Sequence, residues 1–263
     1  MQERTEKIGW GERLWAALIF FTRLPFWRLH QPPRESYRSV VEFWPLTGWV
    51  TGGIMGGTLY SSNLFMPYAV PVILAIAMRL LVTGALHEDG LADFMDGFGG
   101  GVDRERILAI MKDSHIGTYG VLGLVIYVLL LAATLFSLPP AVAALGIVAA
   151  DPYAKMLSSQ LVSMMPYART EETAKNHTVY RRPSIAAGIS QSVQGLLPMV
   201  TFLWLTGMSE WYYIIFVPGV VMYFLYLLIW RKLQGYTGDC CGAVCLLVEL
   251  ATLLTIAFTC KSF

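Results

Sequence analysis

Long apolar runs separated by short polar connections make up most of the chain. A transmembrane helix needs about 20 consecutive apolar residues, and runs of that length recur along this sequence. The pattern predicts an all-α fold, a polytopic transmembrane helical bundle of about seven spans. We place the spans at residues 40–60, 68–87, 117–136, 140–165, 184–206, 211–230 and 239–260.

Two further segments predict helices that do not cross the membrane. The apolar run at residues 14–27 covers only about 14 residues and contains Arg23 and Pro25, which is short for a span. We expect it to form an N-terminal interfacial or re-entrant helix. Residues 104–120 begin with an apolar stripe at helical spacing and with charged residues opposite it. This segment is expected to contain a cytoplasmic amphipathic helix.

Basic residues are distributed unevenly among the connections. The connections at 61–67, 137–139 and 207–210 contain neither Lys nor Arg, whereas the alternate connections are basic. Positively charged loops usually stay in the cytoplasm, so we expect a multi-pass protein of the inner, or cytoplasmic, membrane whose active site faces the cytoplasm. No internal repeat or linker divides the chain, so residues 1–263 are expected to form a single integral-membrane domain.

Composition agrees with a membrane protein and excludes several function classes. Apolar residues make up 56% of the chain and charged residues 14%, which is too apolar for an ordinary soluble domain. A net charge of +1 lacks the basic excess of a nucleic-acid-binding surface. The motifs of P-loop, dinucleotide-binding and serine-hydrolase sites are absent from the sequence. The four cysteines lie in one apolar C-terminal run without metal-ligand spacing, and we expect buried free thiols.

The stretch HEDGLADFMDG, residues 87–97, concentrates carboxylates in an otherwise apolar chain. If the second helix continues through it, Asp89, Asp93 and Asp96 lie at i, i+4 and i+7 and share one face. Oxygen ligands of this kind suit Mg²⁺ or Mn²⁺ better than zinc, so the stretch predicts a metal site that binds a diphosphate. The alternative is a solvated acidic loop. His87 is expected to be a hydrogen-bond partner of these carboxylates rather than a catalytic group.

Charged residues inside the predicted spans need partners, because burying an isolated charge in a membrane is costly. Arg79 lies roughly 12 Å deeper than the acidic stretch, given a rise of 1.5 Å per residue; it could reach a phosphate or neutralise the carboxylates. Asp151 and Lys155 are four residues apart and predict an ion pair. Glu249 needs a partner or a proton. The glycines of residues 48–57 predict close helix packing.

Several motifs together resemble the cobalamin synthase family, the adenosylcobinamide-GDP ribazoletransferases, and the resemblance extends over nearly the whole chain. Members of that family are multi-pass membrane enzymes that depend on Mg²⁺. The resemblance implies that adenosylcobinamide-GDP is joined to α-ribazole, or its 5′-phosphate, with release of GMP, in the last joining step of vitamin B12 assembly. The motifs are FFTRLP (20–25), FWPLTG (43–48), ALHEDGLADFMDG (85–97), MKDSHIGTYG (111–120), YAR (167–169) and GYTGDCCGA (235–243).

The resemblance also implies roles for particular side chains. Mg²⁺ would be bound by Asp89, Asp93 and Asp96, with Glu88 assisting. Asp113 is the candidate base, with a metal ligand or an N-cap of the third span as alternatives, and Asp96 is the second catalytic candidate. Asp239 is a candidate ligand or the N-cap of its own helix. The residues expected to bind substrate or its phosphates are Arg23, Arg79, Arg104, Arg106, Lys112, His115, Arg169, Thr237 and Asp239.

Three positions depart from the family pattern. His115 stands where Arg is frequent, which would weaken one phosphate contact or make it pH-dependent. Asp151-Pro152 replaces a usual Ser-Arg pair, and residues 170–172 replace a usual Glu-Gly. The alternative functions are a CDP-alcohol phosphotransferase, whose D-x-x-D-G opening DFMDG partly matches, and an ion-coupled transporter. The expected partners are the small-molecule substrates and membrane lipid, with no nucleic acid; the sequence leaves the number of metal ions and self-association into a homo-oligomer open.

Overall fold

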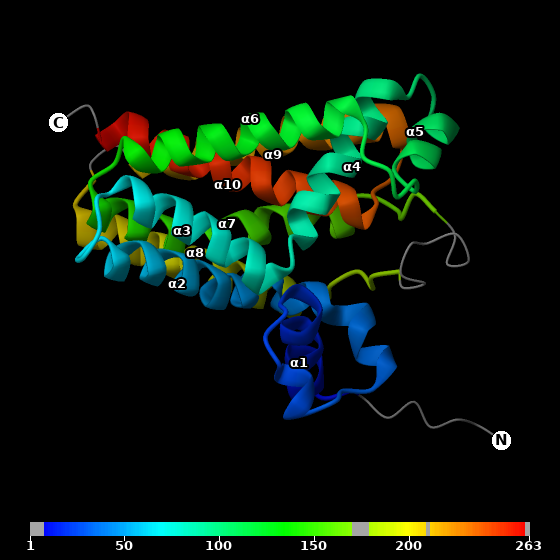
Figure 1. The fold of residues 1–263 in the computed structure, drawn as a ribbon. Helices are drawn as coiled ribbons and strands as arrows, with labels where there is room; N and C mark the ends of the chain where they lie inside the picture. The colour runs from blue at the N-terminus through cyan, green and yellow to red at the C-terminus, as the bar shows by residue number, and fades with distance from the viewer. Residues whose placement is uncertain (1–7, 170–178, 209–210, 261–263) are drawn as a thin grey trace.

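The computed structural model describes residues 8–169, 179–208 and 211–260. Within these ranges the protein is all-α, and its long helices run in roughly the same direction (Figure 1). The helices are α1 (Trp10–Phe21), α2 (Trp44–Ser62), α3 (Ala69–Thr83), α4 (Leu86–Gly100), α5 (Arg104–Ile110), α6 (Thr118–Phe136), α7 (Pro140–Met164), α8 (Ile185–Thr206), α9 (Trp211–Leu233) and α10 (Gly238–Cys260). Two 3₁₀ segments, η1 (Phe26–Arg28) and η2 (Arg34–Phe43), follow α1.

Fewer of the described helices qualify as candidate membrane spans than the sequence predicted. In the described residues, 5 helices are long and apolar enough to cross a membrane, or up to 6 if the bent pair α3–α4 counts as one span. The helices that qualify alone are α6, α7, α8, α9 and α10. The expected first span is α2, which has 19 residues but contains many glycines, serines and threonines that lower its mean hydropathy. The expected count of about seven spans is therefore not supported.

The second predicted span does not continue through the acidic stretch. Helix α3 ends at Thr83 and α4 begins at Leu86, with a bend of 91° between them. Gly84 and Ala85 both have left-handed backbone conformations, with φ of 64° and 53°, which no continuous α-helix can contain. Helix α4 consequently crosses the direction of the bundle (Figure 1). The whole acidic stretch nevertheless lies on α4, so its helical register is kept.

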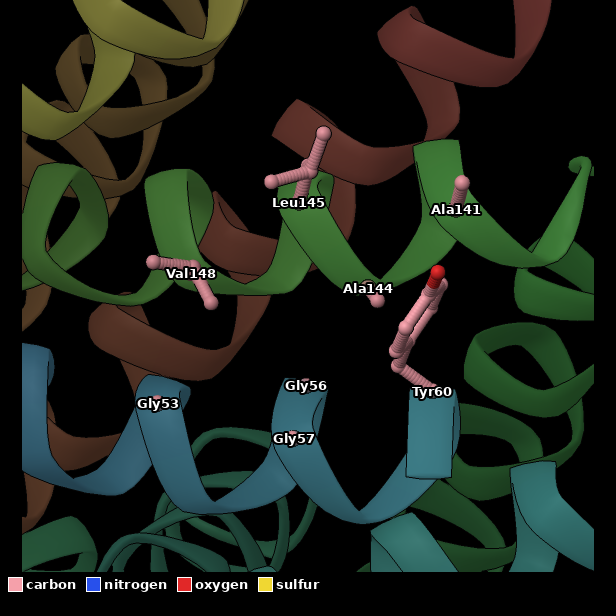
Figure 2. Close-up of a pocket in the computed structure, with 8 residues that line it drawn as sticks. All are labelled: Gly53, Gly56, Gly57, Tyr60, Ala141, Ala144, Leu145 and Val148. Carbon is pink, nitrogen blue, oxygen red and sulfur yellow. The ribbon is translucent and has the colours of Figure 1, made fainter. Parts of the chain in front are cut away.

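Helices α2 and α7 approach closely where α2 carries glycines. A Cβ atom at Gly48 would lie 2.7 Å from the Cα of Pro152, and one at Gly56 would lie 2.6 Å from the carbonyl oxygen of Ala144. This confirms the predicted close packing. Gly53 and Gly57 instead face a cavity of about 440 Å³ that lies between the two helices and opens to the surface, and it is lined mostly by small and aliphatic residues (Figure 2).

The N-terminal segment lies at the end of the bundle where α4 and α5 lie (Figure 1). Helix α1 has 12 residues and is directed across the long helices, which agrees with the prediction that it does not span the membrane. An ion pair between Arg13 and Glu42 joins it to η2. Trp10, Trp27 and Leu29 are exposed on this segment.

The predicted ion pair inside α7 is present. The Nζ of Lys155 is paired with the carboxylate of Asp151, and it also donates a hydrogen bond to Oγ1 of Thr51 on α2 at 2.7 Å. Thr51 Oγ1 lies 2.5 Å from the second oxygen of Asp151. The departure from the family at Asp151 is therefore part of a buried α2–α7 contact. All four cysteines are free thiols and Cys260 alone is not fully buried. The departure at residues 170–172 lies outside the described residues.

Candidate active site

The acidic face of α4 meets the start of α10 at one end of the bundle. Asp89 is exposed, Asp93 is half-buried and Asp96 is buried. Gly90 allows the two helices to touch, because a Cβ atom there would lie 3.1 Å from the Cα of Asp239. This close approach places Asp239 beside the part of α4 that carries Asp89. We call Asp89, Asp93 and Asp239 the carboxylate site.

Asp96 serves a different contact from the one expected of it. Its two carboxylate oxygens accept hydrogen bonds from the backbone N–H groups of Gly117 at 2.6 Å and Gly120 at 2.8 Å. These groups lie at the N-terminus of α6, where no partner within that helix exists for them. A buried carboxylate used in this way caps α6, which differs from the metal-ligand and catalytic roles predicted from the sequence.

Asp113 lies on the exposed connection between α5 and α6. Its carboxylate accepts a hydrogen bond from the backbone N–H of His115 at 3.0 Å and lies 2.7 Å from Nδ1 of the same residue. These hydrogen bonds lower the pKa of Asp113 from its usual 3.8. The alternative that Asp113 caps the third span is wrong, because Gly117 occupies the N-cap position of α6 and Asp96 supplies the oxygens.

The deeper charges form a buried network beneath the carboxylate site. Arg79 on α3 is paired with Glu249 on α10 at 2.8 Å and with Glu88 on α4 at 3.2 Å. Its guanidinium also donates to the hydroxyl of Tyr127 on α6 at 2.5 Å. Glu249 thus has the partner that the sequence required. Of the two readings of Arg79, the contacts support neutralisation of the carboxylates, and Glu88 is turned toward this network.

His87 pairs with an aromatic residue rather than with a carboxylate. The indole Nε1 of Trp44 donates to Nε2 of His87 at 3.3 Å, and the two rings stack with centroids 5.8 Å apart. Phe21 stacks against both rings, with its centroid 5.2 Å from that of Trp44 and 6.3 Å from that of His87. The predicted carboxylate partner of His87 is therefore wrong, because the ring is buried in an aromatic stack that joins α1, α2 and α4.

Threonine rather than aspartate caps the last helix. The backbone N–H of Cys240 donates to Oγ1 of Thr237 at 3.2 Å, which is the N-cap pattern for a helix that begins at Gly238. Asp239 lies in the first turn, where a negative charge is favourable next to the helix N-terminus. Of the two roles predicted for Asp239, the N-cap is excluded.

Two of the predicted phosphate-binding arginines donate hydrogen bonds to backbone carbonyls. Arg104 donates to the carbonyls of Leu233 and Ala168, each at 2.8 Å, and Arg169 donates to that of Leu108 at 2.9 Å. These contacts join α5 to the C-terminal end of α9 and to the residues that follow α7. Helix α5 has 7 residues and ends sooner than the sequence predicted.

The other basic residues lie nearer to open surface. Arg106 and Lys112 are exposed on and just after α5. Arg23 lies at the corner between α3 and α4. Its backbone N–H donates to the carbonyl of Val82 at 2.6 Å, and its side chain lies against Gly84. Sequence reasoning missed Tyr127, because a tyrosine within a long apolar span carries no signal of a polar partner.

The carboxylate site fits a hard divalent cation that is also bound by a ligand. Among the described residues no group of three or more His, Cys, Asp or Glu side chains is arranged to hold a metal ion. Mg²⁺, however, usually takes only one or two carboxylates and completes its shell with water and phosphate oxygens. Asp89 and Asp93 on adjacent turns of α4, with Asp239 nearby, supply that kind of donor. The alternative of a solvated acidic loop is wrong, because the stretch is helical and packed.

Comparison with known proteins identifies the family to which the chain is similar. The family model described as cobalamin-5-phosphate synthase matches residues 13–257. The adenosylcobinamide-GDP ribazoletransferase of Leptothrix cholodnii is 36% identical, with 90% of this chain and 92% of that protein covered. The enzymes of the same name from Vibrio parahaemolyticus and Shewanella woodyi are 35% and 32% identical, each over 91% of this chain and over 89% and 93% of their own lengths. No solved structure matches the chain.

Proposed function

The chain belongs to the cobalamin-5-phosphate synthase family, and from this membership we propose where and how it performs the adenosylcobinamide-GDP ribazoletransferase reaction. The reaction joins adenosylcobinamide-GDP to α-ribazole, or its 5′-phosphate, and releases GMP in the final assembly of the nucleotide loop of vitamin B12. We propose that it takes place at the carboxylate site. The observation that carries this placement is the contact of Gly90 with Asp239, which brings acidic residues of α4 and α10 to one place.

The transfer breaks the phosphoanhydride bond of the pyrophosphate bridge and forms a phosphodiester bond. The ribazole hydroxyl attacks the phosphorus that remains attached to cobinamide, the bond to GMP breaks, and the hydroxyl proton is released. Such transfers depend on positioning and on neutralising charge more than on covalent help from the protein. Asp89 and Asp93 would hold Mg²⁺, with Asp239 nearby, and the bound ion would supply positive charge to the phosphate oxygens.

Basic side chains near the site would bind the pyrophosphate. Arg106 and Lys112 are exposed at the end of the bundle that contains α4, and Arg23 lies at the α3–α4 corner. Each can donate charge-assisted hydrogen bonds to phosphate oxygens. Arg104 and Arg169 act indirectly, since their carbonyl contacts hold α5 in place. Thr237 acts in the same way, because it begins the helix on which Asp239 lies.

Asp113 remains our candidate for accepting the hydroxyl proton. It is exposed and forms a pair with His115, and a carboxylate whose pKa lies below the usual 3.8 is ionised at neutral pH. The same lowering makes it a weak base, so any contribution comes from its position rather than its basicity. Asp96 we assign to the cap of α6.

The membrane orientation is a proposal that follows from charge. The described parts of the basic connections lie at the same end of the bundle as α4 and the start of α10 (Figure 1), and by the positive-inside rule this would be the cytoplasmic end. Exposed apolar side chains along α6, α8 and α9 would contact lipid. The exposed Trp10 and Trp27 of the N-terminal segment suit the membrane interface, where amphipathic aromatic rings are favoured.

A reconstituted assay tests the proposal. The purified protein in lipid nanodiscs is given adenosylcobinamide-GDP, α-ribazole 5′-phosphate and Mg²⁺, and release of GMP is followed. We expect GMP release that stops when EDTA is added and resumes with excess Mg²⁺. A well-folded sample that releases no GMP but turns over a CDP-alcohol would contradict the assignment. GMP release unaffected by EDTA would remove the metal from it.

A further inference from the structure

A charged cluster from four helices lies buried beneath the carboxylate site. We propose that Arg79 and Glu249 are positioning residues that hold α4 at its angle to α10, and that they thereby set the separation of Asp89 and Asp93 from Asp239. The inference rests on the proposed function, but the position of α4 relative to α10 can be measured without the reaction.

Arg79 is the centre of the cluster. It is 3% exposed, and its guanidinium reaches Glu249 on α10 at 2.8 Å and Glu88 on α4 at 3.2 Å. Tyr127 on α6 accepts a third contact at 2.5 Å. One side chain on α3 therefore touches three other helices, and two of them carry the residues of the carboxylate site.

The ion pair to Glu88 crosses the bend between α3 and α4. Arg79 lies before the bend and Glu88 after it, and only Gly84 and Ala85 separate the two helices. Two residues in left-handed conformations do not extend a helical hydrogen-bond ladder; the N–H of Ala85 instead donates to the carbonyl of Leu80 at 3.0 Å and closes the end of α3 before the 91° bend. A contact between side chains on either side of the corner restrains it.

The incomplete hydrogen bonding of the cluster indicates that it fixes the arrangement of the helices rather than stabilises the fold. Both oxygens of Glu88, one oxygen of Glu249 and the Nε of Arg79 are buried and have no hydrogen-bond partner. The contact of Glu88 with Arg79 is thus an ion pair without hydrogen-bond alignment. Such groups cost free energy that well-packed apolar side chains would avoid. The cluster is a poor source of stability, yet it joins α3, α4 and α10. Its role is therefore to set the positions of these helices relative to one another.

A second buried cluster provides a matched control. Thr51, Asp151 and Lys155 bond to one another at similar depth of burial, but their hydrogen bonds remain within α2 and α7. Removing charge there, in Asp151→Asn/Lys155→Met, perturbs a buried ion pair whose hydrogen bonds lie within α2 and α7. The two clusters therefore separate a positioning effect from a general loss of stability.

The experiment measures helix geometry and metal binding together. Spin labels are attached at Gly100→Cys on α4 and Leu254→Cys on α10, with Cys260→Ser removing the partly exposed native thiol, and their distance distribution is recorded. Mn²⁺ binding is measured by EPR on unlabelled protein. The test variants are Arg79→Met and the neutral set Arg79→Met/Glu88→Gln/Glu249→Gln, with Arg79→Lys as the conservative replacement.

We expect both test variants to shift or broaden the distance distribution and to weaken Mn²⁺ binding by about tenfold or more, as removal of groups that support metal ligands does. Arg79→Lys should recover part of both. The neutral set is informative even if Arg79→Met folds poorly, because it leaves no unpaired charge. The α2–α7 control should keep the wild-type distribution and Mn²⁺ affinity even if its melting temperature falls.

A neutral set with the wild-type distance distribution would overturn the proposal, and so would an equal change in the α2–α7 control. The proposed function fails separately. If wild-type protein binds no Mn²⁺ or releases no GMP, the function is wrong, while the distance measurement still decides whether Arg79 and Glu249 fix α4.

Discussion

The carboxylate of Asp96 on α4 accepts the backbone N–H of Gly117 at 2.6 Å and so fastens the start of α6 to the end of the acidic stretch. The second oxygen takes the N–H of Gly120 at 2.8 Å. Both glycines are needed for this contact, because a Cβ atom at either would lie within 2.5 Å of a carboxylate oxygen of Asp96. Two motifs that are separate in the sequence, DFMDG and IGTYG, therefore form one structural unit.

Removing either side of this contact should destabilise the protein. Asp96→Ala leaves the buried amide of Gly120 and the partly buried amide of Gly117 without their acceptor, which should cost about 2–4 kcal/mol of unfolding free energy. Gly120→Ala should act similarly by displacing the carboxylate. Gly100→Ala is the control, because its Cβ would meet only ordinary contact at 3.5 Å. Unfolding in detergent, followed by circular dichroism, measures the differences. A stable Asp96→Ala variant with weakened Mg²⁺ binding would return Asp96 to the metal site.

The glycines of α2 predict opposite effects for the same substitution. Gly56→Ala should destabilise the protein by about 1–3 kcal/mol, because the added carbon would lie 2.6 Å from the carbonyl oxygen of Ala144. Gly53→Ala meets nothing within 4 Å and should be neutral or stabilising by up to about 1 kcal/mol, since Ala favours helix more than Gly. Thermal unfolding of the two variants side by side checks this. Equal destabilisation would mean that the cavity in Figure 2 is closed in solution.

Properties set by neighbours along the chain could be predicted from the sequence. The apolar runs identified the long helices because span length depends only on local composition. The spacing of Asp89 and Asp93 gave their shared face, and it survives the break because both residues follow Ala85. The ion pair of Asp151 and Lys155 was predictable because both residues lie four apart on one helix.

Contacts between distant segments could not be predicted. Nothing near Asp96 indicates that its oxygens face amides more than twenty residues later. The partner of Glu249 lies 170 residues earlier, at Arg79, and the sequence showed only that each needs one. The bend was missed because the residues on both sides of Gly84 have helical spacing, and a left-handed Ala85 is unusual for a residue with a Cβ atom.

A substitution within the carboxylate site should abolish turnover without unfolding the protein. Asp93→Asn keeps the shape of the side chain but removes its charge, so we expect GMP release to fall by at least about a hundredfold, the scale at which loss of one electrostatic contact to the transition state acts. Asp103→Asn is the matched control: Asp103 caps α5 by accepting the N–H of Arg106, and Asn caps equally well. Near-normal turnover of Asp93→Asn would remove Asp93 from the site.

The pH dependence of turnover tests the role of Asp113. Hydrogen bonds from His115 lower the pKa of this carboxylate from its usual 3.8, so its basic form is fully populated from neutral pH down to about 5. If Asp113 accepts the hydroxyl proton, kcat should therefore show no acidic limb from its titration above pH 5, and Asp113→Asn should lower kcat by about tenfold to a thousandfold with little change in KM. His115→Gln should let the pKa of Asp113 rise toward 3.8 and still leave kcat at pH 7 unaffected by that change. A profile from pH 4.5 to 9 on wild type and both variants makes the comparison, and Asp113→Asn with kcat within twofold of wild type would show that the proton leaves by another route.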